Sequence, residues 1–434
     1  MVNRSRKPPI NSQYNLSIPK PQILTLSNGI TLYTIKGEGL GIIRMDFMWR
    51  GGRTTEVIPG LARSSMQCLN DGTSKNSYQD LSELFDFYGS SVSYRSSLEH
   101  LHASISLIKA DIDAVIPTFI ATIVDRKIDE KLLKQRQNRF AERLTSELSK
   151  NTVVAYRELT ERLFGQDHLY GYSTQPSDYT EIRANQIENY LNTHINTEGC
   201  TVVISGDIGR EEEAIIISLL ESMPRKASQF IPPSYQEVKN NADNGKRLYL
   251  PGSQPNQVTI RMGRRLFSRG HEDADHIRLS NVILGGYFGS RLMTKIREEK
   301  GYCYHIDSSV DLLDYDGYIS ISAEVNSKFT NECIQEIESE MQHLMKENVP
   351  DDELDRVKQY IRGQFLMDSD GVFAASNLVR RYLAVGKDET EFKKKLEVLE
   401  TITADDIRSV AKKYFNPVEY MKIIVGDIPD SMSQ

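Results

Sequence analysis

The sequence predicts an α+β protein made of two related halves, each a mostly antiparallel sheet with helices packed on one face. Two observations predict this fold. Strand-type alternations of apolar residues are mixed with helix-period segments in both halves of the chain. In addition, Gly-Asp-Ile occurs at 206–208 and again at 426–428, 220 positions later, and the helix-period segment before each copy keeps that offset, as with Ile187 and Ile407. A duplicated unit is the simplest explanation.

The composition is that of an ordinary globular protein and excludes several classes of function. At 434 residues the chain is too long for one hydrophobic core, and 39% hydrophobic with 26% charged residues gives no sign of a fibrous or low-complexity protein. A net charge of −7 without a basic cluster argues against a nucleic-acid partner. No run of about 18 apolar residues predicts a membrane span.

The ends of the chain and its cysteines give an expected location. The N-terminus is polar and proline-containing, so we expect a disordered arm and no signal peptide. The four cysteines lack metal-type spacing and are expected to be reduced thiols. We therefore expect a cytoplasmic protein.

Composition shifts divide the chain into four parts. Residues 1–22 are the expected arm, and 23–222 form the first half. Residues 223–246 are polar, contain three prolines and lack either period, which is typical of a linker. Residues 247–434 form the second half.

In the first half, an Asn28-Gly29 turn and period-two alternation predict a hairpin, and further strands follow. The expected strands lie at 26–35, 42–49, 91–108 and 201–208. Helices are expected within 59–73 and at 81–88, three more within 111–164 with breaks near 125–129 and 150–152, and another at 185–194.

The second half repeats this plan. Strands are expected at 257–263, 302–310, 318–325 and at the C-terminal end up to Ile428. Helices are expected at about 272–284, within 285–300, and at 328–346, 351–367 and 404–414.

The segment from Gly285 to Val310 carries the most informative pattern. Leu292 and Ile296 lie four apart on one helical face, and Gly301 supplies the left-handed residue that ends a helix. Alternation then places Tyr304 and Ile306 on one face of a strand. The helix–Gly–strand order brings Arg297 near Tyr304.

Two interpretations of Arg297 and Tyr304 stay open from these residues. A guanidinium and a phenol aimed at one point are hydrogen-bond donors suited to a developing oxyanion. Alternatively, Arg297 is a helix C-terminal charge favoured by the macrodipole, and Tyr304 is a half-buried strand aromatic. Aligning Gly89 with Gly301 places Phe85 opposite Arg297 and Val92 opposite Tyr304, so the donor pair exists in one copy of the repeat only.

At Gly60–Thr73 and at Arg297–Tyr304 the chain resembles the pitrilysin family of zinc peptidases, which includes insulin-degrading enzyme (insulinase) and the mitochondrial processing peptidase. The resemblance runs from about Leu26 to Ile428 and implies a half-clamshell. Family members place H-x-x-E-H between the Gly-Leu-Ala and Gly-Thr that stand here at 60–62 and 72–73. The five motif positions are Arg63, Ser64, Ser65, Met66 and Gln67, so both histidines and the glutamate are missing.

The resemblance therefore implies that this chain holds no zinc. A third family ligand would fall near Arg143 or Leu144, and Glu142 and Glu147 nearby cannot hold a catalytic metal alone. Two further histidine pairs are weak candidates. His100 and His102 share a strand face and are expected to be solvated, and His271 and His276 do not share a helical face.

What the chain keeps is the family's second-half motif, S-R-L-x-x-x-I-R-E-x-x-G-x-x-Y, which Ser290 to Tyr304 match. In related enzymes its Arg and Tyr bind the substrate carbonyl beside the zinc site. Bacterial members of this size often form pairs in which one chain carries zinc and the other the Arg and Tyr. The implied function is the non-catalytic subunit of a heterodimeric peptidase, with Arg297 and Tyr304 acting in trans on a peptide and zinc held by the homologous partner.

Two alternatives remain. The chain is a structural or peptide-holding scaffold, as the core proteins of a respiratory complex resemble processing peptidases without cleaving. Less favoured is a standalone peptidase with a rebuilt metal site, for which the sequence offers no complete ligand set.

Overall fold

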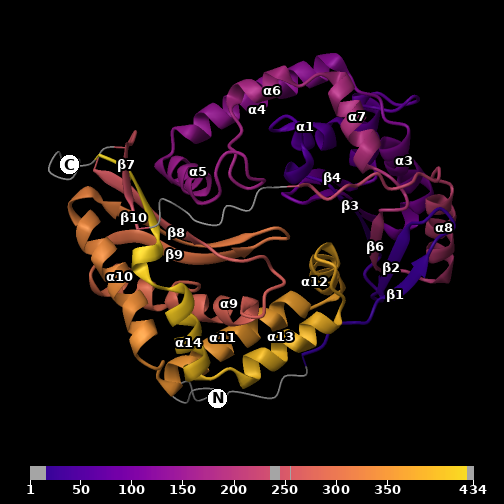
Figure 1. The fold of residues 1–434 in the computed structure, drawn as a ribbon. Helices are drawn as coiled ribbons and strands as arrows, with labels where there is room; N and C mark the ends of the chain where they lie inside the picture. The colour runs from indigo at the N-terminus through magenta and orange to yellow at the C-terminus, as the bar shows by residue number, and fades with distance from the viewer. Residues whose placement is uncertain (1–15, 235–244, 255, 428–434) are drawn as a thin grey trace, which may run out of the picture.

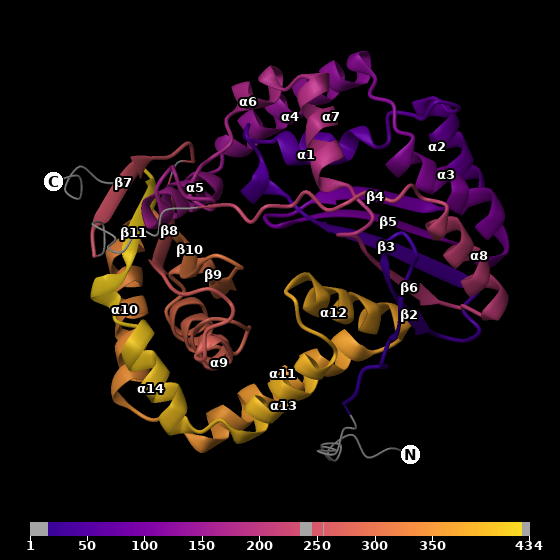
Figure 2. The same cartoon turned by 45° about the vertical axis from the view of Figure 1, so that its right-hand side comes forward.

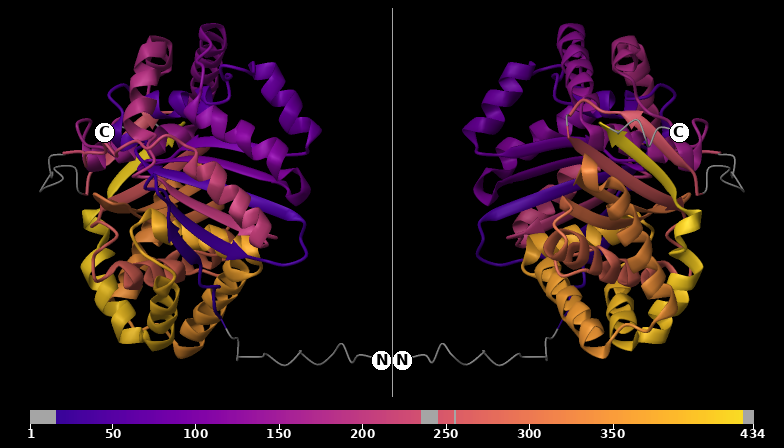
Figure 3. Two further views of the ribbon diagram at one scale, coloured as in Figure 1. Left: turned by 90° about the vertical axis from the view of Figure 1, so that its right-hand side faces the viewer. Right: turned by 90° about the vertical axis from the view of Figure 1, so that its left-hand side faces the viewer.

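The computed structural model describes residues 16–234, 245–254 and 256–427. The structure has two sheets, one from each half of the chain, and most helices lie on their outer sides (Figures 1 and 2). Figure 3 shows the two halves stacked, with the first half above the second in both views. The α+β fold with two helix-covered sheets is as predicted.

The first sheet has the order β1-β2-β6-β3-β5-β4, with β4 as an edge strand. Only β2 and β6 pair in parallel. Its strands are β1 (Gln22–Thr25), β2 (Thr31–Lys36), β3 (Ile42–Arg50), β4 (Ser91–Ser96), β5 (His100–Ile108) and β6 (Thr201–Gly206). The odd-numbered residues of β3 from Ile43 to Trp49 are buried and face the helices, as the alternation predicts.

Eight α-helices belong to the described part of the first half. They are α1 (Leu61–Cys68), α2 (Tyr78–Phe87), α3 (Ile112–Val124), α4 (Glu130–Leu148), α5 (Asn151–Phe164), α6 (Pro176–Glu181), α7 (Ala184–His194) and α8 (Arg210–Glu221). The breaks between α3, α4 and α5 fall where the sequence predicts them. The helix α6 and the helix α8 were not predicted.

The second sheet has the order β7-β11-β8-β10-β9, with β9 as an edge strand and only β7 and β11 parallel. Its strands are β7 (Arg247–Pro251), β8 (Gln257–Arg265), β9 (Cys303–Leu312), β10 (Gly317–Asn326) and β11 (Met421–Gly426). This order repeats β2-β6-β3-β5-β4 strand for strand. The topology therefore carries the same duplication as the sequence, although Ile428 lies outside the described residues.

The helices of the second half are α9 (Ala274–Leu284), α10 (Thr330–Lys346), α11 (Asp351–Ser369), α12 (Val372–Ala384), α13 (Thr390–Thr401) and α14 (Ala404–Tyr414). The sequence predicts neither α12 nor α13. Residues Met293–Glu299 form a π-helix, η3, where the sequence predicts an α-helix. No helix within the described ranges is long and apolar enough to cross a membrane.

Each half contributes one helix that packs on the sheet of the other half. Helix α5 packs on β8 and β11 of the second sheet, where Leu159 joins Ile423 and Val425 in one buried cluster. Helix α12 packs on β6 and β2 of the first sheet through Val379. Figure 2 shows α12 reaching towards the first sheet. The predicted single helix-covered face is therefore incomplete, because each sheet also receives a helix from the other half on its second face.

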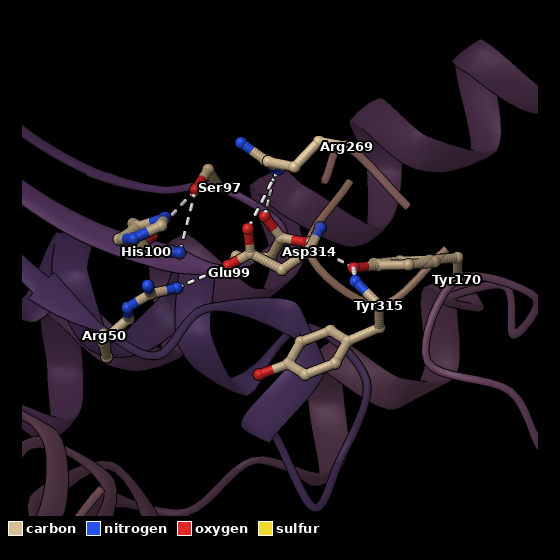
Figure 4. A network of polar contacts seen from close by, with 8 residues as sticks. All are labelled: Arg50, Ser97, Glu99, His100, Tyr170, Arg269, Asp314 and Tyr315. Atoms are coloured by element: carbon tan, nitrogen blue, oxygen red, sulfur yellow. Dashed lines mark hydrogen bonds and ion pairs between the residues drawn. The ribbon is translucent and has the colours of Figure 1, made fainter. Parts of the chain in front are cut away.

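The equivalent hairpins of the two halves meet at a buried polar cluster (Figure 4). Glu99, in the β4–β5 turn, accepts hydrogen bonds from the Asp314 backbone N–H at 2.7 Å, from the Tyr170 hydroxyl and from the Arg269 guanidinium. Arg269 and Arg50 both pair with Asp314, in the β9–β10 turn. This cluster fixes one sheet against the other.

Candidate functional site

The remnant of the metal motif lies on α1, which begins after Gly60. Gly60 adopts a left-handed conformation (φ 88°), and the Glu56 carboxylate accepts hydrogen bonds from the backbone N–H groups of Gly60 and Ala62 at 2.9 Å. This carboxylate therefore caps the helix. Burial raises the pKa of Glu56, although these bonds and the one from Tyr172 favour its charged form.

Arg63, Met66 and Gln67 stand where the family motif has His, Glu and His. Each of these side chains makes other contacts. The Arg63 guanidinium lies 4.4 Å from the centre of the Phe140 ring. Met66 is fully buried in the core, and the Gln67 amide donates to the Tyr94 carbonyl oxygen at 2.6 Å. A guanidinium, a thioether and an amide do not form a zinc site, so the residues present do not fit the metal.

No carboxylate or imidazole replaces these ligands. Arg143 forms an ion pair with Glu147 on α4 at 2.9 Å, Leu144 is half-buried against the core, and Glu142 is exposed. Among the described residues, no group of three His, Cys, Asp or Glu side chains could hold a metal ion.

The prediction that His100 and His102 are solvated is wrong. Both side chains lie on the face of the first sheet that α12 approaches, and their ring centres are 6.1 Å apart. Burial, followed by the charges of Arg50 and Arg269, lowers the pKa of His100 to about 3. The pKa of His102 is also lowered to about 3, by burial first and then by Arg380. Sequence could not reveal this, because the covering helix comes from the other half.

The segment before β9 is organised by a π-helix. Leu292 and Ile296 are buried, as predicted, and the Lys300 N–H bonds to the Lys295 carbonyl five residues earlier. Gly301 then takes the predicted left-handed conformation (φ 65°). π-helical turns are rare and often mark functional sites. Arg297 lies within this π-helix.

Arg297 is half-buried and lacks an acidic partner. Its guanidinium lies 5.4 Å from the centre of the exposed Phe288 ring, and no hydrogen bond or ion pair joins it to another described residue. Burial raises the pKa of Cys303 to about 11, and the charge of Arg297 opposes that shift. The charge of Arg297 is therefore felt at Cys303, the residue before Tyr304.

Tyr304 lies at a β-bulge. In the register of β9 with β10, Glu324 pairs with His305 and Val325 pairs with Cys303, so Tyr304 has no residue opposite. Its side chain is 88% exposed, whereas Ile306 is fully buried. The predicted shared face of Tyr304 and Ile306 is therefore wrong, because the bulge inserts one residue and turns the phenol outward. Its hydroxyl bonds to no described residue.

The equivalent segment of the first half shares the glycine but has neither the two donors nor the π-helix and the bulge. Gly89 is also left-handed (φ 59°), which supports the alignment with Gly301. Phe85 is buried in the core, and Val92 pairs with Ile105 in an uninterrupted register. The two copies thus differ in backbone as well as in side chains.

Comparison with known proteins gives a family model that matches part of the chain. Residues 181–361 match the family model described as the peptidase M16 inactive domain. This part of the chain is therefore similar to an inactive M16 peptidase domain. The match includes Arg297 and Tyr304, and it begins within the first half, before α7, so that it covers β6 and α8 but not α1.

Relatives and solved structures agree with this assignment. An uncharacterized zinc protease of Streptomyces coelicolor is 19% identical over 92% of this chain and 93% of its own. A protein of Helicobacter pylori named as a non-peptidase homolog is 19% identical over 80% of each chain. A solved peptidase M16 inactive domain from Pseudomonas fluorescens superposes with a TM-score of 0.83 at 16% identity, covering 94% of this chain and 98% of that one. At this identity the structural likeness establishes the fold.

Proposed function

We propose that this chain is the non-catalytic subunit of a two-chain peptidase and supplies Arg297 and Tyr304 to bind a substrate carbonyl. The observation that carries the proposal is the pair itself. Two hydrogen-bond donors without partners among the described residues lie close in sequence, Arg297 in the π-helix before the edge strand β9 and Tyr304 at the start of that strand. Arg297 lies in a π-helix and Tyr304 at a β-bulge, and both irregularities are common at functional sites.

The edge of β9 offers a place for a peptide strand next to these donors. The backbone N–H and C=O of Ser308 face this edge and are already taken by the Gly285 carbonyl and the Asn281 amide. By strand alternation the backbone of Ile306 faces the same edge, closer to Tyr304. An extended peptide pairing there would run past the phenol.

The chemistry divides between the two chains. Zinc chemistry would be supplied by a homologous partner that carries H-x-x-E-H, because α1 of this chain does not fit the metal. The Arg297 guanidinium and the Tyr304 hydroxyl donate hydrogen bonds to the carbonyl oxygen as negative charge develops on it. One such donor typically contributes about 3 to 4 kcal/mol to transition-state stabilisation.

The test is turnover of a peptide by the reconstituted pair. Arg297→Ala and Tyr304→Phe should each lower kcat by about 100- to 1,000-fold, while the pair still assembles on a sizing column. Arg356→Ala on α11 and Tyr78→Phe on α2, which alter surface side chains of the same types, should retain wild-type turnover.

Wild-type turnover in both site variants would reject the proposed role. The chain would then be a structural or peptide-holding scaffold subunit, as in the alternative from the sequence. A chain that purifies alone or with itself from its host would reject the partner.

A further inference from the structure

A pocket of about 300 Å³ lies beside the first turn of α1, away from Arg297 and Tyr304 along the chain. It is lined by two arginines, one glutamate and the end of the edge strand β4. The lining residues used below are Arg53, Glu56, Arg63, Ser96 and Tyr179.

Each arginine is held against an aromatic ring. The Arg53 guanidinium lies 4.1 Å from the centre of the Tyr172 ring, and that of Arg63 lies 4.4 Å from the centre of the Phe140 ring. Stacking fixes the plane of a guanidinium and leaves the N–H groups at its edge available. These two side chains are therefore oriented before any ligand arrives.

The donors of both arginines are only partly used, although a side-chain hydrogen bond from Arg53 contributes to lowering the pKa of Tyr172. Arg63 makes one long hydrogen bond, to the Tyr179 hydroxyl at 3.4 Å. The Nε of Arg53 is buried and has no hydrogen-bond partner. Within the described ranges neither guanidinium forms an ion pair. A buried donor without an acceptor costs free energy, so a ligand that supplied an acceptor would be stabilised.

The carboxylate in the pocket does not neutralise this pair by direct contact. Glu56 is committed to the backbone of Gly60 and Ala62 and to the Tyr172 hydroxyl at 2.7 Å. A third arginine, Arg157, also lies nearby. After burial, the charge of Arg53 is the next cause that lowers the pKa of Arg157. Glu161 and Asp178 oppose that shift, so Arg157 also has acidic neighbours. The lining itself contains two arginines and one glutamate, which leaves a net charge of +1.

The free edge of β4 indicates that the anion belongs to a peptide. The Tyr94 carbonyl faces away from β5, since it accepts from Gln67. By alternation the backbone of Ser96, in the pocket wall, faces the same free edge. A peptide strand lying along this edge would carry its side chains or its end past the two arginines.

We propose that this pocket binds a carboxylate of an extended peptide, with Arg53 and Arg63 as the anion receptor. Planar guanidinium groups match a carboxylate, which can accept two parallel hydrogen bonds from each. The carboxylate comes either from an acidic side chain or from the C-terminus of the peptide. This inference is independent of the partner and of the carbonyl-binding role proposed above.

The test uses labelled pentapeptides and the isolated full chain. Fluorescence anisotropy compares acetylated and amidated Ala-Ala-Glu-Ala-Ala with its Gln counterpart, and penta-alanine with a free or an amidated C-terminus. At least one carboxylate peptide should bind about tenfold tighter than its neutral counterpart. The pair that shows the difference identifies the source of the carboxylate.

Variants then assign the effect to the pocket. Arg53→Gln and Arg63→Gln should abolish the preference for a carboxylate, and Arg63→Lys should restore it only in part, because an ammonium lacks the planar fork. Arg139→Gln removes the same charge from an exposed position on α4 next to Phe140 and should keep the preference. Acetate should displace the preferred peptide from the wild-type chain, which requires no variant to fold.

Equal affinity within both peptide pairs would overturn the inference. So would a preference that survives in the Arg53 and Arg63 variants. Binding of inorganic phosphate without binding of any carboxylate peptide would also overturn it, since the receptor would then serve another anion.

Discussion

The Arg269 guanidinium donates a hydrogen bond to the Glu99 carboxylate at 2.7 Å, and this contact joins residues that belong to different halves of the molecule. Glu99 is only 6% exposed and also accepts from Tyr170 and Asp314 (Figure 4). One carboxylate therefore gathers three donors at the joint between the two sheets.

Glu99→Ala should destabilise the fold. It removes the acceptor of three donors, while Arg269 keeps its ion pair with Asp314, so the expected loss is about 1 to 3 kcal/mol. Urea unfolding measures the free energy. Glu299→Ala is the matched control, because it breaks an exposed pair with Lys295 and should leave that free energy unchanged. Equal effects of the two variants would contradict the importance of the joint.

The packing of α5 on the second sheet depends on a glycine in β8. A Cβ added at Gly263 would lie 2.6 Å from Leu159 Cδ2 and 3.1 Å from the Ile319 carbonyl oxygen. Gly263→Ala should therefore lower the free energy of unfolding by about 1 to 3 kcal/mol, and Leu159→Ala by about 2 to 5 kcal/mol.

The double variant tests the contact directly. Its loss should be smaller than the sum of the two single losses, because shortening Leu159 makes room for the added methyl group. Gly363→Ala is the control, because it should raise the free energy of unfolding. Gly363 lies exposed within α11 with nothing within 4 Å of an added Cβ, so alanine should stabilise that helix. Additive losses at 263 and 159 would contradict the cross-packing.

His102 should make stability depend on pH. Its Nδ1 is buried without a hydrogen-bond partner, and burial, then Arg380, His100 and Arg95, lower its pKa from 6.5 to about 3. Between these values the unfolded chain binds the proton and the folded chain does not, so stability falls as the pH falls below 6.5. The slope from this group approaches about 1.4 kcal/mol per pH unit.

Urea unfolding of the wild type and of His102→Gln at pH 7.5, 6.5 and 5.5 measures this contribution. The variant should lose less free energy of unfolding on acidification than the wild type does. The same slope in both proteins would mean that His102 is charged in the folded state.

The purified chain should bind zinc far below one ion per molecule after dialysis against zinc, measured by elemental analysis. Arg63 and Gln67 lie on one side of α1 and offer no metal ligand. Arg63→His with Gln67→His would place two imidazoles four residues apart and should raise zinc uptake. Stoichiometric zinc in the wild type would instead revive the standalone peptidase.

Much of the fold could be predicted because its signals are local. Most strands of each sheet, the break between α3 and α4 and the left-handed Gly301 follow from short periodic patterns and turn residues, whereas β1 and β7 were not predicted. The duplication was visible as a constant offset between similar segments. The loss of the metal motif at Arg63, Met66 and Gln67 was equally direct, since it depends only on which side chains are present.

The details of the candidate site could not be predicted. The π-helix before Arg297 and the bulge at Tyr304 depend on how β9 meets β10 and how η3 packs against β9. An α-helix and a regular strand would fit the same sequence pattern. The pocket at Arg53 and Arg63 was also missed, because its aromatic supports lie on a distant helix and loop.

The sequence by itself determined the fold class, the repeat, the missing metal ligands and the choice of Arg297 and Tyr304 as candidates. Only the tertiary structure decided that α5 and α12 each pack on the sheet of the other half, that His100 is buried and His102 half-buried, and that Tyr304 faces outward. The physical reason is the range of the interactions. Periodicity and turn preferences act within a few residues, whereas burial, strand register and helix packing between the halves are set by contacts between segments far apart in the chain.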